Sequence, residues 1–358
     1  MKRYRCCVAA AGAVVALVVT GCSSAGGSST TTPASSASTA GASSASASTA
    51  GSGAATDTSA AKVTIAIPAG SAAASFIQLA VAAGLTKQNG LDVTLIDTVT
   101  PPDTPAALES GSIQASALTS TATQAFAKGL PVVNVVDTGT HAPLVMLGAP
   151  GLKTISDLKG KSVVTSASTD TPGTETAQLL KNAGIASSVK VISVASVPGR
   201  SALFDSGQAD AIYEALNLAL QDQAKRPGSS IIGDNLTLLP TPADGLAVTK
   251  SFLTGHEATV KALVKSCIQA AVMMKNKPAQ AAPFLMKIYG LTASQVQEFL
   301  QRQSSTLVIN GVPAAVDYAN QAKLFNDEPG NTTPWTAAKV QASWDTTIAA
   351  TVAQQLGE

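Results

Sequence analysis

The sequence predicts an α/β fold with mostly parallel sheets. Short apolar or alternating segments typical of strands are followed by segments in which apolar residues recur at helical spacing. This alternation runs from residue 63 to residue 136 and begins again after residues 138–140, which suggests a second α/β unit. The 358 residues are enough chain for one large or two moderate domains.

The first unit alternates strand and helix regularly. Residues 63–67 alternate and stop at Pro68, which predicts a strand, and the spacing from Phe76 to Ala83 predicts a helix that ends near Gly84. The other elements expected here are strands at 92–97, 113–118 and 132–136 and helices at 104–110 and 120–128.

The second unit is built in the same way, and a helical region follows it. We expect strands at 144–147, 161–166, 189–194, 209–213 and 246–249, and helices at 171–183, 199–205 and 216–225. The helices expected after this unit are 251–276, 278–289, 293–303, 314–327 and 334–355.

A short internal repeat links the two units. Residues 107–111 (Ala-Leu-Glu-Ser-Gly) lead into Ile-Gln-Ala, and residues 202–207 (Ala-Leu-Phe-Asp-Ser-Gly) lead into Ala-Asp-Ala. Each copy reads as a helix end, a glycine suited to a left-handed cap and the start of a strand. The repeat favours two similarly built lobes, although α/β units in general can recur in this way.

Composition excludes several classes of protein. A net charge of +1 argues against a nucleic-acid-binding protein. Three of the four cysteines lie in the first 22 residues and only Cys267 remains, so we expect neither an internal disulfide nor a cysteine-rich zinc site in the folded part. With two histidines and no paired catalytic motif, we expect no catalytic residue, no metal site and no cofactor.

The N-terminus is typical of an exported lipoprotein. Basic residues precede an apolar run at 8–19 that is too short to span a bilayer but fits the apolar region of a signal peptide. Residues 18–22 (Val-Val-Thr-Gly-Cys) resemble the lipobox of bacterial lipoproteins, which implies a signal peptide over residues 1–22 and lipidation of Cys22. The alternative is an ordinary secretory signal with a chance cysteine. Residues 23–61, almost entirely Ser, Thr, Ala and Gly, are expected to form a disordered tether.

A set of motifs in the folded part resembles the substrate-binding proteins of ABC importers, in the group that includes nitrate, alkanesulfonate, taurine and thiamine-precursor binders. The motifs run in family order through residues 80–85, 89–93, 107–111, 127–132, 155–161, 183–185 and 202–211. The resemblance implies a two-lobed periplasmic-binding-protein-like (type II) fold, each lobe a three-layer α/β sandwich, with a hinge between them. Lobe one would hold residues 62–140 and 246–358, and lobe two residues 141–245.

The resemblance also implies a function. The chain would capture a small polar organic solute between its lobes, as a monomer lipid-anchored on the outer face of the cytoplasmic membrane, and deliver it to an ABC permease and its ATPase. One alternative is a ligand-sensing lipoprotein that docks on a membrane receptor. Another is an enzyme like some thiamine-precursor relatives, but this chain lacks their cysteine cluster.

Ligands of α/β sheets bind beyond the carboxyl ends of strands, at helix N-termini with free N–H groups. Each candidate site below also has a purely structural interpretation, as a glycine turn, a helix cap or a surface acid near a hinge. We expect Thr171 to cap the lobe-two helix. Glu214 is the main specificity candidate, because a carboxylate at the end of a strand can accept from a ring N–H or an ammonium group. The candidate ligand-binding residues are Gly70, Ser71, Ala72, Gln78, Thr119, Ser120, Thr121, Thr169, Thr171, Gly173, Thr174, Glu214 and Asn217.

Five further residues stand out by type or position. His141 lies near a crossing between the lobes, where a hinge hydrogen bond is expected rather than a ligand contact. Arg200 begins a helix and either is solvated or pairs with a nearby anion or acid. Cys267 is expected to fill the core, and Trp335 and Trp344 to pack in the core or between the lobes.

Overall fold

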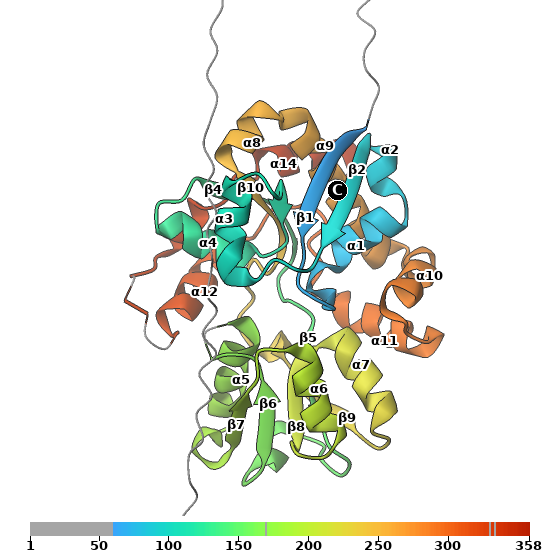
Figure 1. Cartoon of the computed structure of the whole chain (residues 1–358), viewed down its shortest axis with the longest axis vertical. Coiled ribbons are helices and arrows are strands. Elements are labelled where there is room, and N and C mark those ends of the chain that lie inside the picture. Colours follow the sequence, from blue (N-terminus) through green and yellow to red (C-terminus); the bar gives the residue numbers. More distant parts are fainter. Residues whose placement is uncertain (1–59, 169, 329–330, 333) are drawn as a thin grey trace, which may run out of the picture. The chain divides into compact units, whose positions relative to one another are not determined.

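The computed structural model describes residues 60–358 except 169, 329–330 and 333 (Figure 1). The predicted signal peptide, Cys22, nearly all of the predicted tether and Thr169 therefore lie outside the described residues. The described part contains two five-stranded sheets, flanked by helices, so the predicted α/β class is confirmed.

The first sheet has the strand order β2-β1-β3-β10-β4. Strand β10 is antiparallel to its neighbours β3 and β4, whereas β1 is parallel to β2 and β3. The strands are β1 (Ala61–Ala66), β2 (Leu91–Ile96), β3 (Ala115–Ser116), β4 (Val132–Gly139) and β10 (Asp244–Thr249).

The second sheet repeats this plan, with the order β7-β6-β8-β5-β9. Here β5 is the strand that runs antiparallel to both of its neighbours, β8 and β9. Both sheets are therefore mixed: in each of them one strand, β10 or β5, runs against the direction of its neighbours. The strands are β5 (Leu144–Gly148), β6 (Ser162–Thr165), β7 (Lys190–Ser193), β8 (Ala211–Ala215) and β9 (Ser230–Asp234).

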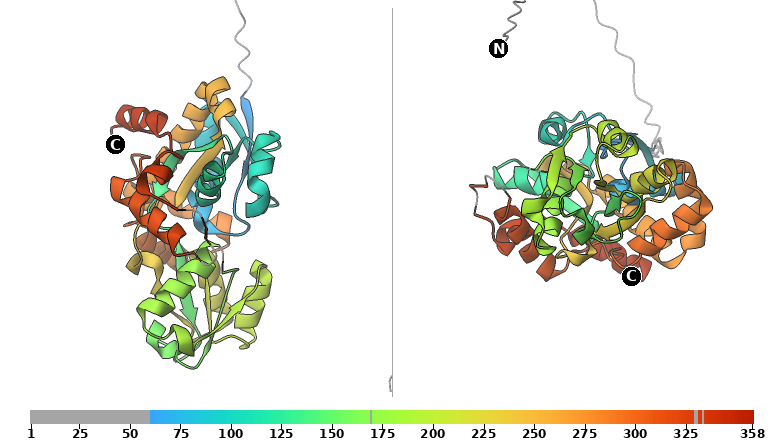
Figure 2. Two further views of the ribbon diagram at one scale, coloured as in Figure 1. Left: turned by 90° about the vertical axis from the view of Figure 1, so that its left-hand side faces the viewer. Right: turned by 90° about the horizontal axis from the view of Figure 1, so that it is seen from below.

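Helices cover both faces of each sheet (Figures 1 and 2). The first sheet carries α3 and α4 on one face and α9 and α14 on the other, with α1 packed on α9; the second sheet carries α5 on one face and α6 and α7 on the other. These helices are α1 (Ser75–Ala82), α3 (Thr104–Glu109), α4 (Thr119–Ala127), α5 (Thr171–Asn182), α6 (Val197–Asp205), α7 (Leu216–Lys225), α9 (Glu257–Asn276) and α14 (Thr347–Leu356).

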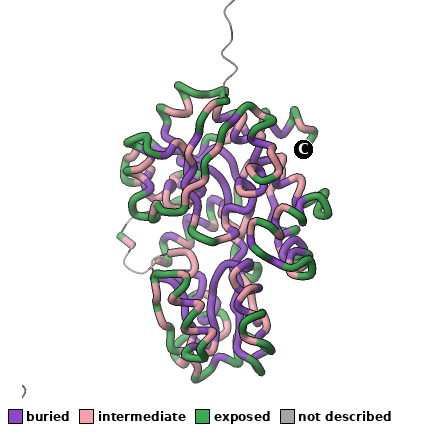
Figure 3. Tube along the Cα trace, turned by 45° about the vertical axis from the view of Figure 1, so that its right-hand side comes forward, coloured by how far each residue is buried: buried purple, intermediate pink, exposed green. Residues whose placement is uncertain are grey.

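The alternation of side chains explains this layering. In β8, Ile212 packs with the α6 and α7 side chains, while Ala211 and Tyr213 pack with α5. In β1, Ile65 and Ala66 likewise belong to clusters on opposite faces of the sheet. Such strands are buried on both faces, as the purple segments at the centre of each sheet show (Figure 3).

The internal repeat corresponds to two equivalent turns. Gly111 after α3 and Gly207 after α6 both have positive φ, +72° and +77°. In the first copy Ile113 N donates to Ala107 O, and in the second Ala209 N donates to Leu203 O, so the hydrogen bonds have the same spacing. The repeat therefore marks the same helix-to-strand turn in two similarly built halves.

The C-terminal region departs from the expected helices in two places. The predicted helix at 251–276 is divided at His256 into α8 (Lys250–Gly255) and α9. The predicted helix at 334–355 is wrong as a single element, because residues 342–346 leave α13 (Ala337–Gln341) to bond with the edge strand β4. Asn134 N donates to Ser343 O and Asp345 N donates to Asn134 O. The other helices are α2 (Leu85–Gln88), α10 (Pro278–Tyr289), α11 (Ala293–Gln303) and α12 (Ala315–Asn326).

Candidate functional site

Two segments of chain cross between the sheets, and they pair with each other. The first, residues 140–143, joins β4 to β5; the second, residues 235–243, leads from β9 to β10. Thr241 N donates to Thr140 O and Ala243 N to Gly139 O, both at 2.9 Å. A third segment joins them, since Thr140 N donates to Thr306 O. The hydrogen bond expected of His141 is present, because its Nε2 lies 3.3 Å from Leu238 O in the second crossing segment.

The loop after β1 is hydrogen-bonded to a residue of α7, the helix that follows β8 in the second sheet. Asn217, in the first turn of α7, donates through Nδ2 to Gly70 O at 2.8 Å and accepts at Oδ1 from Ala72 N at 3.0 Å. The structure therefore brings three of the predicted ligand residues together across 147 positions of sequence. Asn217 is only 1% exposed, so its amide is used to join the two halves of the chain. Ser71 caps the short helix that follows, accepting from Ala73 N.

The start of α5 differs from the predicted cap. Asp170, not Thr171, is the N-cap, and its carboxylate accepts hydrogen bonds from Gly173 N and from the hydroxyl of Ser166. A carboxylate caps better than a threonine here because it also interacts favourably with the helix dipole. Gly173 has no room for a side chain, since a Cβ there would lie 1.9 Å from Ala167 O. Thr174 Oγ1 donates to Ser168 O at 3.4 Å, and Thr171 is half-buried at the helix start.

The start of α4 is tied to the second crossing segment. The helix begins at Thr119, one residue before the prediction, and it has no side-chain cap, so the capping interpretation of its hydroxyls is wrong. Thr119 Oγ1 instead donates to Ala243 O at 3.3 Å, and Ser120 Oγ accepts from Gln321 Nε2. Thr121 is half-buried.

Gln78 is half-buried, whereas Glu214 lies in the protein interior. Gln78 Oε1 accepts from the Tyr289 hydroxyl at 2.5 Å, which joins α1 to the end of α10. Glu214 is 1% exposed, and no N–H or hydroxyl donor reaches its carboxylate oxygens within the described part of the chain, although the Asp222 carboxyl group lies within hydrogen-bonding reach. The interpretation of Glu214 as a surface acid is therefore wrong. Burial raises the pKa of Glu214 well above its usual range, and the nearby Asp222 carboxylate raises it further.

Arg200 is buried beside this acid but does not form an ion pair with it. Its Nη1 donates to the carbonyl oxygens of Val194 and Ala195, both at 3.0 Å, and the residue is 7% exposed. The expectation of a solvated arginine is wrong. The Arg200 guanidinium contacts backbone carbonyl oxygens directly. The Glu214 and Asp170 carboxylates attract it only from a longer distance.

Two acids that the sequence analysis did not select lie near the crossing segments. Glu175, in α5, accepts from the Tyr213 hydroxyl at 2.6 Å and from Asn235 Nδ2 at 3.3 Å; the Asn235 amide also donates to Ala142 O in the first crossing segment. Asp244, the first residue of β10, is 5% exposed, and its Oδ1 atom has no partner among the described residues. No local sequence pattern signals either acid, because each is buried by segments that are distant in the sequence.

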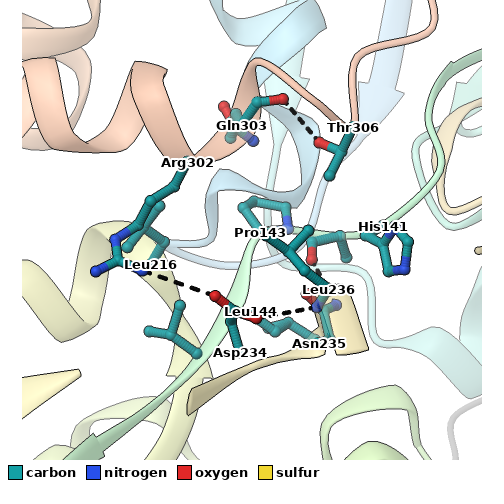
Figure 4. A pocket seen from close by; sticks show the side chains of 12 residues that line it. His141, Pro143, Leu144, Leu216, Asp234, Asn235, Leu236, Arg302, Gln303 and Thr306 are labelled. Atoms are coloured by element: carbon teal, nitrogen blue, oxygen red, sulfur yellow. Dashed lines mark hydrogen bonds and ion pairs between the residues drawn. The ribbon is translucent and has the colours of Figure 1, made fainter. Parts of the chain in front are cut away.

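A small pocket of about 20 Å³, open to solvent, lies beside the crossing segments (Figure 4). It was not predicted, because it forms where α11 approaches the end of β9. Arg302 Nη1 lies 3.7 Å from Asp234 Oδ2, so an ion pair spans one side of the pocket. The pocket does not include the predicted loops around residues 70, 120 and 171, and it is lined by His141, Ala142, Pro143, Leu144, Val145, Leu216, Asp234, Asn235, Leu236, Arg302, Gln303 and Thr306.

Comparison of the sequence with models of known protein families shows the family of this chain. The sequence model of the family described as NMT1/THI5 like matches residues 73–281, which is more than half of the chain. The chain belongs to the NMT1/THI5-like family. No curated protein sequence matches it.

Solved structures related to this NMT1/THI5-like protein share its fold at low identity. The alkanesulfonate-binding protein SsuA from Xanthomonas axonopodis pv. citri, bound to MOPS, is 18% identical, with a TM-score of 0.64 over 80% of this chain and 99% of that one. The periplasmic nitrate-binding protein NrtA from Synechocystis PCC 6803 is 11% identical, with a TM-score of 0.65 over 83% and 89%. A point mutant of the desulfurization enzyme DszB, in complex with biphenyl-2-sulfinic acid, is 12% identical, with a TM-score of 0.61 over 82% and 99%.

Four further features of this family member complete the description. The described residues contain no group of three or more His, Cys, Asp or Glu side chains able to hold a metal ion. Cys267 is fully buried, as predicted, and burial raises the pKa of its thiol. Trp335 and Trp344 pack with Tyr318 and Phe325 in a cluster of their own, which confirms their packing role. In the described segments no helix combines the length and apolar character needed to cross a bilayer.

Proposed function

We propose that this protein is an extracytoplasmic solute-binding lipoprotein that captures a small polar organic ligand between two lobes and presents it to an ABC permease and its ATPase. The observation that carries the proposal is the pair of hydrogen bonds between Asn217 and the loop at Gly70 and Ala72. These bonds join the loop after β1 to the start of α7, and both lie at carboxyl ends of strands, where α/β sheets bind ligands. Membership of the NMT1/THI5-like family supports the same function.

The lobe boundaries follow from the two crossing segments. We propose residues 62–140 and 246–358 as lobe one and residues 141–245 as lobe two, with the end of the second crossing at Asp244 and Gly245 already paired to β4 of the first sheet. The paired backbone of the crossings is a suitable hinge, because a few residues at the ends of β4 and β10 can absorb the rotation of one lobe against the other. Closure would then be the state that the permease recognises.

The candidate ligand-binding residues are proposed to act in two ways. Asn217 joins the two loops directly, and Gly70 and Ala72 supply the backbone that it holds. The hydroxyls of Thr121 and Thr171, half-buried at the starts of α4 and α5, are proposed to reach the solute. The remaining candidates are proposed either to shape the loops or to contact the solute. They are Ser71, Gln78, Thr119, Ser120, Thr169, Gly173, Thr174 and Glu214.

The membrane anchor and the absence of turnover are also part of the proposal. Cys22 would carry the lipid and the tether would link it to the folded part, on the outer face of the cytoplasmic membrane. We propose a monomer that binds solute without converting it. DszB, which is an enzyme, has a similar fold, so the retained solute should also be checked for turnover.

The decisive experiment is native mass spectrometry of the full chain purified without added ligand. A retained small solute, released on denaturation and unchanged after incubation, supports the proposal. Solution scattering should show compaction when that solute is added back, and Asn217→Ala should reduce both retention and compaction. The exposed Asn276→Ala is the matched control and should behave as the wild type. The absence of any retained or added solute that compacts the protein would reject solute binding.

A further inference from the structure

We propose that helix α7 of lobe two is latched to the turn between α10 and α11 of lobe one, so that the cleft opens on its α5 side and the solute enters there. This inference rests on the proposed solute-binding function and gives the movement of its lobes a direction. The name α7 latch is used below for two hydrogen bonds from side-chain amides to carbonyl oxygens, one donated by Gln221 and the other by Gln295.

Each lobe donates one bond of the α7 latch and accepts the other. Gln221 Nε2, in α7, donates to Tyr289 O at 2.6 Å, and Gln295 Nε2, in the first turn of α11, donates to Leu220 O at 2.6 Å. Residues 217, 220 and 221 share one face of α7, because positions three and four apart are neighbours on a helix. The Asn217 bonds to the loop after β1 extend this contact, and Figure 1 shows α7 beside α11.

Both bonds use groups that the fold already holds in place. Tyr289 is the last residue of α10, so its carbonyl oxygen has no partner within that helix and Gln221 supplies one. Gln295 is fixed by a capping box, in which its Oε1 accepts from Thr292 N at 2.9 Å while its Nε2 reaches α7. Because every donor and acceptor belongs to the protein, the α7 latch forms without a solute.

Apolar packing is continuous across the latched edge of the cleft. One cluster of buried side chains contains Leu216 and Leu220 of α7 together with Leu291 and Val296 from the region of α10 and α11. Tyr289, which is 6% exposed, belongs to the same cluster. Separation of the lobes at this edge exposes apolar surface in addition to breaking the two bonds, so opening there is unfavourable.

The opposite edge of the cleft, between α4 and α5, has no such connection. The apolar cluster on the α5 face contains residues of lobe two only, and the cluster under α4 contains residues of lobe one only. Within the described residues, α5 makes no hydrogen bond to lobe one, and its cap Asp170 accepts from Ser166 and Gly173 of its own lobe. The Thr119 hydroxyl, at the start of α4, bonds to the second crossing segment.

Two separate attachments restrict how the lobes can move. The crossing segments are the first attachment and the α7 latch is the second, so rotation about the line through both remains possible, whereas bending that separates α7 from α11 is blocked. This rotation moves α5 away from α4. Because Thr121 and Thr171 lie half-buried at the starts of these two helices, the solute enters where its proposed hydroxyl contacts are.

The first test removes the donors of the α7 latch from the full chain. Gln221→Met removes one donor, and Gln295→Glu removes the other while keeping the acceptor of the capping box. The reporter is the Ala72 amide, which donates to Asn217 across the lobes and is followed by hydrogen exchange and mass spectrometry. In the double variant this amide should exchange at least about tenfold faster, the order of magnitude expected when two hydrogen bonds are lost.

The second test measures both edges of the cleft with spin labels, after any retained solute has been removed by dialysis. The labelled chain carries serine at positions 6, 7 and 22, and Cys267 is fully buried. In the wild-type background the distance from α7 to α11 should have a narrow distribution and the distance from α5 to α12 a broad one. The double variant should broaden the first distance. The labels are placed at exposed alanines, with Ala224→Cys and Ala293→Cys for the first distance and Ala177→Cys and Ala319→Cys for the second.

Gln223→Met and Gln297→Glu are the matched controls. Gln223 donates to Ser229 O within lobe two, so its loss weakens α7 without changing the latch, and Gln297 is an exposed residue of α11. Both controls should keep the exchange rate and the distances of the wild type. Unchanged Ala72 exchange in the double variant, or a first distance as broad as the second in the wild type, would overturn the inference.

Native mass spectrometry separates failure of the α7 latch from failure of the proposed function. A retained solute in a chain whose two edges open equally contradicts only the latch. An intact latch in a chain that neither retains nor binds any solute contradicts only the solute-binding function.

Discussion

Asn217 and Gly70, 147 residues apart in the chain, are joined by a 2.8 Å hydrogen bond from the asparagine Nδ2 to the glycine carbonyl. The same side chain accepts from Ala72 N, so one amide satisfies a donor and an acceptor of the opposite loop. The first prediction concerns this side chain. Asn217→Ala should lower the free energy of unfolding by about 1 to 3 kcal/mol, since it leaves buried backbone groups unpaired. Urea unfolding measures the loss, and Asn276→Ala should show almost none.

The second prediction concerns the close approach of backbone at the start of α5. Gly173→Ala places a Cβ where the Ala167 carbonyl oxygen lies, 1.9 Å away, so the loop must move. We expect a loss of roughly 1 to 3 kcal/mol or more in unfolding free energy, together with weaker solute retention. Gly255→Ala is the control, because its Cβ would meet no atom within 4 Å and alanine favours helix. Equal stabilities for the two variants would contradict the role given to Gly173.

The third prediction is a pH dependence from Glu175. Burial raises the pKa of Glu175 from 4.5 to about 7. The folded state keeps this proton to higher pH than the unfolded state, so stability should fall as pH rises from about 4.5 to 7 and then level off. The contribution is about 3 kcal/mol at most, at roughly 1.4 kcal/mol per pH unit.

Glu175→Gln isolates this effect. Because glutamine does not titrate, the difference in unfolding free energy between the wild type and the variant should itself change between pH 4.5 and 7. Glu328, whose pKa is also raised to about 7, titrates in the same range and cancels in that difference. A difference that stays constant over this range would show that Glu175 titrates normally.

The fourth prediction concerns the ion pair beside the crossing segments. Arg302 and Asp234 are 34% and 24% exposed in their side chains, so their pairing should contribute only about 0.2 to 1 kcal/mol. A double-mutant cycle with Arg302→Met and Asp234→Asn should give a coupling in this range that shrinks at high salt. Asparagine can keep the hydrogen bond that Asp234 accepts from Leu236 N. A coupling above about 2 kcal/mol would indicate a buried pair that strongly restrains the hinge.

The fifth prediction concerns the anchor. Cys22→Ser should release the protein from the membrane fraction and abolish incorporation of labelled palmitate, because the lipid is attached through the thiol. Cys7→Ser is the matched control and should remain membrane-bound. Membrane binding by the Cys22→Ser chain would contradict the lipoprotein assignment.

The elements that were predicted correctly are those whose signal is local. Strand alternation and the glycine turn at Gly111 and Gly207 depend on neighbouring residues, so the sequence was enough to predict them. Strand β9 was missed because its apolar core is only Ile231 and Ile232, between polar residues. The break near Trp344 was also missed, since it depends on hydrogen bonds with a distant strand.

The site was predictable only in part, for a similar reason. The loops at Gly70 and Asn217 directly follow strands. They could be predicted because ligands of α/β sheets bind beyond the carboxyl ends of strands. The burial of Glu214 depends on how α7 covers β8, which also brings the Asp222 carboxylate beside it. Periodicity describes which face a residue occupies but not which distant carboxylate will lie opposite.

The position of β10 between β3 and β4 has a consequence for the order of folding. The second sheet is made from one continuous stretch, from β5 to β9, and can assemble as soon as that stretch has emerged. The first sheet must wait, because its interior strand arrives only after the whole of the second has been made. As the chain is made, the segment from β5 to β9 should therefore acquire structure first, with β4 left unpaired until β10 inserts beside it.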